Sequence, residues 1–332
     1  MSRIISSSGA AAFVTMLLLM GNRQKQSQVL AFSSPSSARR QHHKPANGDA
    51  IPTKIDSFAE FCLMRLGVDP SSSRHDNSHT PGESSAVYWV GTGELYEAYS
   101  GKLLARFEGF DVGKGVALDD DDSSGNCDHV RQFSRKIFWW RHPESNAIMT
   151  EYDVKPIEPI RYDYQVFDYR RPPSTQDKDF PSADFSCVGT ELPPILPSIV
   201  SGPREVPVLP ITAETSGRNR LAFQCPVFID VETPMGSYQA WENYDYTHDI
   251  SYPEGQPPIC VWARQGAAAP FVENGKGVMR SRAYRVEDYD HLPESVRNLV
   301  ETDEYGLFRN PPKDMAEVER LQEEERKRRK KL

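Results

Sequence analysis

The stretch VYWVGTGELYEAYSGKLLARFEGF (Val87–Phe110) decides the fold class of this chain. From Leu103 to Phe107 an apolar side chain stands at every second position, the period that is typical of a strand with one buried face. Glycine and serine interrupt the stretch, as they do where a chain turns. We therefore expect three strands joined by tight turns: the strands are 87–90, 94–99 and 103–110, and the turns are 91–93 and 100–102.

Similar segments recur along the chain. The further candidate strands are residues 130–141, 147–154, 160–170, 220–233, 237–248, 259–266 and 277–286. Helical patterns are few and short: they cover 55–66, with Asp56 or Ser57 as N-cap, and 292–301. Roughly eight to ten strands joined by short turns predict a mainly β fold, an antiparallel barrel-like or strongly curved sheet with a few short peripheral helices.

Residues 171–210 interrupt this pattern, because nine of these forty residues are proline. Proline cannot donate a hydrogen bond to a ladder, so we expect an irregular crossing segment and no central strand there. The predicted layout is a single β-rich domain over 55–312 that contains this segment, followed by a charged C-terminal helix over 313–332.

The N-terminal residues are typical of a targeting leader. An apolar run, Ala10–Met20, precedes Val29-Leu30-Ala31, which suits the small-residue rule for signal cleavage. The segment that follows is rich in serine and arginine, and the first acidic residue is Asp49, as in transit peptides. We expect a signal peptide over 1–31 and a transit-type leader over 32–50.

Phe32, directly after the predicted cleavage point, resembles the bipartite plastid signal of diatoms and related algae. The resemblance implies the plastid (chloroplast) of an alga with a secondary plastid. Secretion or an endoplasmic-reticulum location is the alternative, because the polar spacer Asn22–Gln28 is long. The apolar run is too short for a membrane span, so no stable span is expected in the mature protein.

Composition limits the partners and cofactors. The formal net charge is −8, and binding to phosphates needs a basic surface, so nucleic acid is not an expected partner. The five cysteines are scattered without a C-x-x-C pair, which predicts free or buried thiols and no zinc site. His248 and His291 could meet Asp245 or Asp249, but their spacing matches no metal motif. We therefore expect neither a metal nor a cofactor.

Several short motifs follow one another between Phe58 and Lys313. They are Val87–Trp89 with Gly93–Tyr96, Leu104–Val112, the hairpin Ser134–Tyr152, Glu242–Tyr246, Trp262–Arg264, Arg280–Arg285, and Leu292–Val300 with Asn310–Pro312. In this order they resemble the family named domain of unknown function 1838, which occurs in bacteria, fungi and algae. The correspondence is poor near Asp119 and in 171–210. The family carries no agreed reaction, so the resemblance implies a fold but no chemistry.

The candidate site centres on QAWENYDYTH (Gln239–His248). As a strand this segment places Trp241 and Asp245 on one side and Glu242 and Tyr244 on the other, so neither face is plainly apolar. A charge on a buried face must be paired. One interpretation is an internal ion pair of Asp245 with an arginine, Arg264 or Arg282.

The other interpretation is a pocket in which a carboxylate acts as acid or base and an arginine holds a carboxylate or enolate. The candidate catalytic residues are Asp245, Glu242, Arg264 and Arg282. The candidate ligand-binding residues are Tyr88, Trp89, Tyr96, Trp139, Trp140, Trp241, Tyr244 and Trp262. Trp139 and Trp140 are adjacent and must face opposite sides of their strand.

The leading hypothesis is a plastid protein that binds a small hydrophobic or aromatic molecule, such as a pigment, isoprenoid or lipid, inside a hollow lined by these residues. It includes a cofactor-free isomerisation, cyclisation or lyase step that uses Asp245 and an arginine. The alternative is a non-catalytic carrier or assembly factor whose exposed aromatic face docks a protein partner. A hydrolase has no support, because the sequence holds no nucleophile motif such as G-x-S-x-G.

Overall fold

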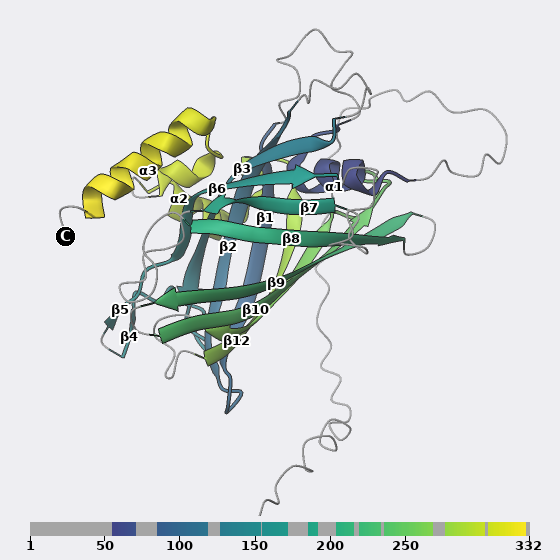
Figure 1. Cartoon of the computed structure of the whole chain (residues 1–332). Helices are drawn as coiled ribbons and strands as arrows, with labels where there is room; N and C mark the ends of the chain where they lie inside the picture. The colour runs from purple at the N-terminus through teal and green to yellow at the C-terminus, as the bar shows by residue number, and fades with distance from the viewer. Residues whose placement is uncertain are drawn as a thin grey trace, which may run out of the picture. The chain divides into compact units, whose positions relative to one another are not determined.

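The strands of this chain form a closed antiparallel barrel, as Figure 1 shows. The computed structural model describes residues 55–70, 85–118, 127–153, 155–171, 185–191, 204–215, 219–233, 236–267, 276–302 and 305–329. These residues belong to one compact unit, Pro52–Leu332. The predicted signal peptide and transit-type leader, 1–31 and 32–50, lie outside the described residues.

Ten strands make up the barrel, in the order β1-β12-β11-β10-β9-β8-β7-β6-β3-β2, and β2 pairs back with β1. Their bounds are β1 Val87–Glu97, β2 Leu103–Ala117, β3 His129–Arg141, β6 Ile160–Arg170, β7 Phe185–Glu191, β8 Arg204–Thr215, β9 Arg220–Thr233, β10 Gly236–Asp249, β11 Ile259–Ala267 and β12 Lys276–Val286. Two short strands, β4 (Glu151–Tyr152) and β5 (Lys155–Pro156), pair separately. The predicted mainly β, barrel-like fold is confirmed.

The turn predicted at 91–93 is wrong, because β1 runs through it as one continuous strand. The glycines there make room inside the barrel and do not bend the chain. A Cβ atom at Gly93 would lie 2.2 Å from the ring of Phe107, and one at Gly91 would lie 3.0 Å from the ring of Phe138. Small residues in β1 therefore allow large aromatic side chains of β2 and β3 to cross over it.

The expectation of an irregular segment over 171–210 is also wrong in its described parts, since β7 and most of β8 lie there. β8 contains Pro207 and Pro210 although it lies between two other strands. Its pairing with β9 begins only at Thr212 and ends at Thr215. Both prolines precede this pairing, so their missing N–H groups cost no hydrogen bond to β9.

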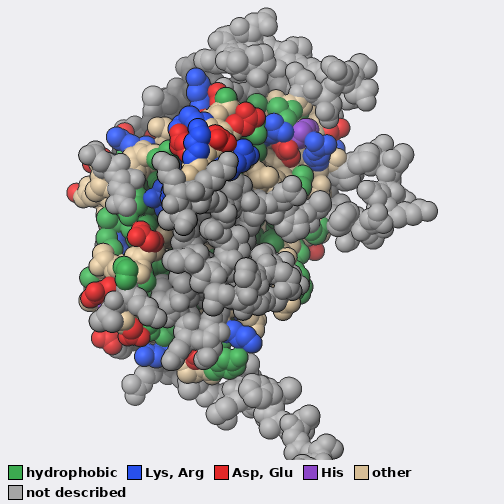
Figure 2. Space-filling model, turned by 60° about the vertical axis from the view of Figure 1, so that its left-hand side comes forward, with side chains coloured by type: hydrophobic (Ala, Val, Ile, Leu, Met, Phe, Trp, Pro, Cys, Tyr) green, Lys and Arg blue, Asp and Glu red, His purple; other side chains and the backbone are tan. Residues whose placement is uncertain are grey.

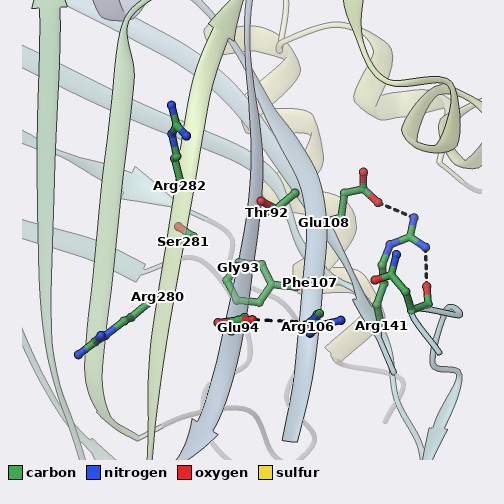
Figure 3. A pocket seen from close by; sticks show the side chains of 11 residues that line it. Thr92, Gly93, Glu94, Arg106, Phe107, Glu108, Arg141, Arg280, Ser281 and Arg282 are labelled. Atoms are coloured by element: carbon green, nitrogen blue, oxygen red, sulfur yellow. Dashed lines mark hydrogen bonds and ion pairs between the residues drawn. The ribbon is translucent and has the colours of Figure 1, made fainter. Parts of the chain in front are cut away.

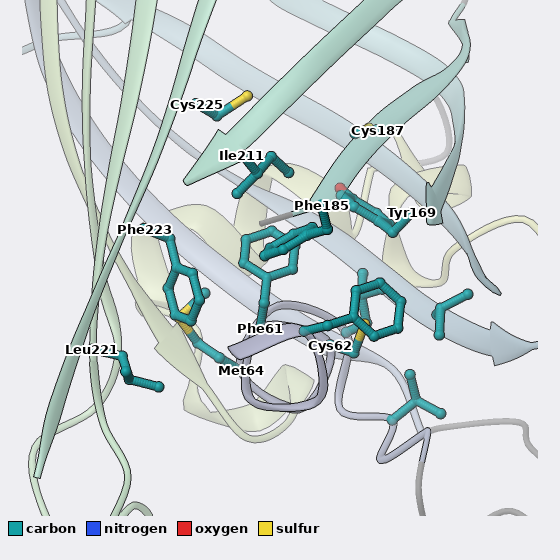
Figure 4. Packing of buried hydrophobic residues seen from close by; sticks show 14 of the residues in the cluster. Phe61, Cys62, Met64, Tyr169, Phe185, Cys187, Ile211, Leu221, Phe223 and Cys225 are labelled. Atoms are coloured by element: carbon teal, nitrogen blue, oxygen red, sulfur yellow. The ribbon is translucent and has the colours of Figure 1, made fainter. Parts of the chain in front are cut away.

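Helix α1 (Ser57–Leu66) fills one end of the barrel, as the close-up in Figure 4 shows. The Asp56 side chain caps its first turn by accepting a hydrogen bond from the Ala59 N–H, and Gly67 ends it with a φ of 69°. The ring of Phe61 packs among aromatic side chains from four strands. These are Tyr169, Phe185, Phe223 and Tyr246.

The C-terminal helices cover part of the outer wall. In α2 (Glu294–Val300) the buried residues Val296 and Val300 pack with the outward side chains of β1, β2 and β3. Val318 of α3 (Met315–Arg329) packs on the outer face of β3 and β6, and Arg135 of β3 pairs with Glu317 at 2.7 Å. Figure 1 shows α3 beside this wall. Across the described residues, no helix has the length and apolar character that crossing a membrane requires.

All five cysteines are buried and none of them forms a disulfide bond, in agreement with the sequence. On the face drawn in Figure 2, basic and acidic side chains are interspersed and do not form a field of one sign. Both observations agree with the composition of the chain.

Candidate functional site

The inner face of β10 carries the centre of the site. The side chains of Glu242, Tyr244 and Tyr246 point into the barrel, while Trp241 and Asp245 point outward. The exposed fraction is 8% for Glu242 and 60% for Trp241. The expectation that Trp241 and Asp245 face a hollow is therefore wrong. Alternation along a strand places neighbours on opposite faces, so the two pairs could not both point inward.

The Glu242 carboxylate holds three donors from β10 and the adjacent β11. Its Oε2 accepts hydrogen bonds from the Tyr244 hydroxyl at 2.8 Å and from Trp262 Nε1 at 3.1 Å. Its Oε1 pairs with Arg264 at 2.9 Å. Burial and the Glu242 carboxylate raise the pKa of Tyr244 well above its usual value, so this hydroxyl stays protonated and donating. The cluster is a fixed polar group in an otherwise aromatic wall.

Lys136 of β3 and Tyr162 of β6 stand on the inner face of another part of the wall. The two strand neighbours of Lys136 point outward: Arg135 pairs with Glu317 of α3, and Ile137 packs in the core beneath α2. Tyr162 lies opposite Lys136 on the adjacent strand. The Lys136 ammonium lies 5.6 Å from the centre of the Tyr162 ring, a cation–π distance.

Some inward side chains around these residues keep part of their surface accessible, although their neighbours Phe107 and Trp140 are buried. Phe138, Tyr162, Tyr244 and Trp262 are only partly buried, although each lies on the inner face of a closed barrel. Around α1, in contrast, Trp89 is 3% exposed. The barrel interior therefore has a filled part and an accessible part. We call the accessible part the lumen site, defined by Lys136, Phe138, Tyr162, Glu242, Tyr244, Trp262 and Arg264.

A groove of about 400 Å³ lies on the outer wall across β12, β1 and β2 (Figure 3). Its charged lining consists of Arg106, Arg141, Arg280, Arg282, Glu94 and Glu108. Arg141 pairs with Glu108 at 2.5 Å, and Arg106 with Glu94 at 3.6 Å. Arg282, a predicted catalytic residue, therefore lies on the opposite face of the wall from Glu242.

The twelve predicted site residues divide evenly between the two faces of the wall. Glu242, Arg264, Trp89, Trp140, Tyr244 and Trp262 face inward. Asp245, Arg282, Tyr88, Tyr96, Trp139 and Trp241 face outward. The predicted ion pair of Asp245 with Arg264 or Arg282 is absent from the described residues, where Arg264 pairs with Glu242 and Asp245 accepts a hydrogen bond from Asn243 at 2.7 Å.

Three outward aromatic residues have structural contacts that explain them. The Tyr88 hydroxyl donates to the carbonyl oxygen of Arg309 at 2.9 Å, and the Tyr96 hydroxyl donates to Glu94 at 2.5 Å. The Trp139 ring meets that of Tyr305 at 5.6 Å. Trp140, on the inner face, meets Phe107 at 5.8 Å, so the two adjacent tryptophans do lie on opposite sides of β3.

The two histidines considered for a metal site lie apart. His248 Nε2 contacts Glu60 of α1 at 3.2 Å inside the barrel, and His291 pairs with Asp288 at 3.0 Å in an exposed turn. Within the described ranges, no group of three His, Cys, Asp or Glu side chains could hold a metal ion.

Sequence reasoning missed Lys136, Phe138 and Tyr162. A signal was present: in VRQFSRKIFWWR, Lys136 and Phe138 share the strand face of Trp140, a predicted site residue. The β-bulge between β3 and β6, which breaks the register near Ser134, hid the matching face of Tyr162.

No family model, no curated protein and no solved structure matches this chain. The resemblance to the family of domain of unknown function 1838 stays a prediction. The inferences about function below therefore depend on the geometry of the lumen site.

Proposed function

We propose that this protein binds a small hydrophobic or aromatic molecule at the lumen site. The observation that carries the proposal is the accessible surface of Phe138, Tyr162, Tyr244 and Trp262 on the inner face of a closed barrel. An inner wall of this kind suits apolar ligands, since it combines aromatic side chains with a few fixed polar groups. A pigment, an isoprenoid or a lipid has the required chemistry.

A cofactor-free isomerisation, cyclisation or lyase step is the catalytic form of this proposal. Glu242 and Arg264 are the charged predicted residues that face the accessible lumen. Asp245 and Arg282 would take no part, because they lie on the outer face. Because the Glu242 carboxylate accepts hydrogen bonds from Tyr244 and Trp262 and pairs with Arg264, it would hold these two aromatic side chains in a fixed orientation toward a ligand.

A second candidate function is a carrier or assembly factor that docks a protein partner. The observation in its favour is an aromatic pair on the outer wall: the rings of Phe228 and Trp241 stack with centroids 4.9 Å apart, and both side chains are exposed. Val261 and Tyr284 are further exposed apolar side chains on the same wall. Aromatic residues of this kind are enriched at interfaces.

Paired tryptophan variants test the leading proposal. Purified protein is titrated with pyrenebutanol, a neutral aromatic probe, and pyrene fluorescence is recorded. Trp262→Ala should weaken binding by about tenfold, because it removes a large aromatic contact surface. Trp241→Ala is the matched control, the same change on the outer wall, and should leave binding unaltered. Equal affinity in all three proteins would refute binding at the lumen site.

The plastid location is a separate proposal. It is supported by the leader-like composition of residues 1–50. Fusion of these residues to a fluorescent protein, expressed in an alga with a secondary plastid, should give fluorescence that coincides with chlorophyll. A reticular or secreted signal would favour the alternative location.

A further inference from the structure

Lys136 is a charged side chain that the proposed function does not yet use. It lies on the inner face of β3, where its cross-strand neighbours are Asp111 and Tyr162. Burial raises the pKa of the Cys260 thiol on β11 to about 12, and the Arg65 and Lys136 cations both oppose that rise. The Lys136 ammonium lies over the ring of Tyr162, and its side chain is partly accessible on this inner face.

The other cations that face the interior have partners. Arg65 of α1 pairs with Asp111 at 2.5 Å, and Arg264 pairs with Glu242 at 2.9 Å. Arg285 of β12 donates to the carbonyl oxygens of Leu63 and Met64 at 2.7 and 2.9 Å, at the C-terminal end of α1. The contacts of Arg65 and Arg285 join α1 to the wall of the barrel. The contact of Arg264 lies within the cluster around Glu242.

Lys136 differs from these cations. Within the described parts of the chain no carboxylate pairs with its ammonium, and its neighbour Asp111 is already engaged with Arg65. Its ammonium contacts the face of the Tyr162 ring, and the side chain is partly accessible. A partly desolvated cation is stabilised by an anion, and among the described residues the carboxylate beside Lys136 is that of Asp111, which pairs with Arg65.

We infer that the ligand of the lumen site is an amphiphile with a carboxylate head group, and that Lys136 binds that head group. This inference rests on the proposed function. The apolar body would lie along the accessible faces of Phe138 and Trp262, and the carboxylate would complete the charge balance at Lys136. A fatty acid or an acidic isoprenoid has this chemistry, while an uncharged hydrocarbon or alcohol lacks the anion.

Two probes with the same ring system test the inference. Pyrenebutyrate carries a carboxylate where pyrenebutanol carries a hydroxyl, and both are titrated against the full chain at neutral pH. The protein should bind pyrenebutyrate about tenfold more tightly, since a partly desolvated ion pair adds to the shared apolar contacts. Lys136→Met should remove this preference and change the affinity for pyrenebutanol less than twofold.

Control variants keep the outcomes distinct. Lys102→Met makes the same change in an exposed turn and should keep the preference. Lys136→Arg retains the cation and should also keep it, which provides a second variant if Lys136→Met does not fold. If neither probe binds, the proposed function fails. If both bind equally, or if Lys136→Met keeps the preference, the inference about the carboxylate is overturned while the proposed function stands.

Discussion

The two parts of the barrel interior differ in how completely their inward side chains are buried. Around α1 the inward side chains are almost fully buried, as at Trp89, Phe185 and Phe223. At the lumen site Tyr244 and Trp262 have similar chemistry but keep accessible surface. In a barrel of about eight strands, the inward side chains can fill the interior. This barrel has ten strands and is therefore wider, so its inward side chains do not fill the interior completely. A helix fills that space at one end.

Charges follow the same division. Beside α1, Arg65 and Asp111 form a pair that water barely reaches, and Asp111 keeps the pKa of Arg65 above its usual value although burial acts against it. At the lumen site the Glu242 cluster and Lys136 border the accessible space. The same types of residue therefore fix a helix in one part and are available to a ligand in the other. Substitutions in each part should differ in their effect on stability.

The largest effect is expected at Phe61, the centre of the filled part. Phe61→Ala should lower the free energy of unfolding by about 4 kcal/mol, because the cavity cannot collapse among aromatic rings on several strands. Leu63→Ala on the same helix is the matched control, with a side chain that is 41% exposed, and should change stability by less than about 0.5 kcal/mol. Urea denaturation measures both. A small loss at Phe61 would show that α1 does not fill a rigid core.

The Arg65–Asp111 pair should give the next largest effect. Asp111→Asn should cost about 3 kcal/mol, because it leaves the Arg65 charge buried without its carboxylate. The double variant Arg65→Met, Asp111→Leu should recover much of this loss, since both charges are then absent. Denaturation of the unaltered protein, Arg65→Met, Asp111→Leu and the double variant completes a thermodynamic cycle. If Asp111→Asn is neutral, water reaches this pair and the contrast between the two parts is lost.

Glu242→Gln should have a smaller effect on stability, about 1–2 kcal/mol, although the carboxylate holds three donors. Water in the accessible part can solvate Arg264 once its partner is neutral. Glu94→Gln is the control on the outer wall, where the ion pair is exposed, and should cost less than about 0.5 kcal/mol. A loss at Glu242 as large as that at Asp111 would mean that the lumen site is as dry as the filled part.

The sequence was sufficient for the fold class, because the alternation from Leu103 to Phe107 is local and regular and further candidate strands recur with short turns between them. It was insufficient where glycine or proline has a tertiary role. Gly93 accommodates the ring of Phe107 and does not form a turn, and Pro210 lies in β8 before its pairing with β9 starts. Local propensity cannot report either circumstance, since both depend on residues far away in the chain.

The candidate site was predicted in part for a related reason. Alternation separates Glu242 and Tyr244 from Trp241 and Asp245, but it does not say which face lies inside when both carry aromatic and acidic side chains. The neighbouring strands decide this, since β9 places Phe223, Cys225 and Val227 beside the face that contains Glu242. The bulge between β3 and β6 similarly prevented a match of Lys136 with Tyr162 from sequence.

The smallest expected difference concerns the rates at which buried thiols react. Burial raises the pKa of Cys225 and Cys260 to about 12, and it raises the pKa of Cys62 and Cys187 well above the usual value. At pH 8 a thiol with a pKa near 12 is thiolate in only about one molecule in ten thousand, so the native protein should react very slowly with iodoacetamide. Because the pKa of these thiols is higher in the folded than in the unfolded protein, their protonation stabilises the folded state below a pH of about 8.5. This stabilisation is lost as the pH rises toward about 12.

Labelling should therefore accelerate between pH 8 and pH 10, and among these four cysteines it should begin at Cys225 and Cys260. Each of these two is 7% exposed, whereas Cys62, which lies in α1, is fully buried. Peptide mapping after timed labelling measures the order, and Cys225→Ser with Cys260→Ser should remove the early products. Simultaneous labelling of all the cysteines would mean that the thiols react only through global unfolding. In that case the core around α1 would open as one unit, and the difference in exposure among its thiols would have no effect on their reactivity.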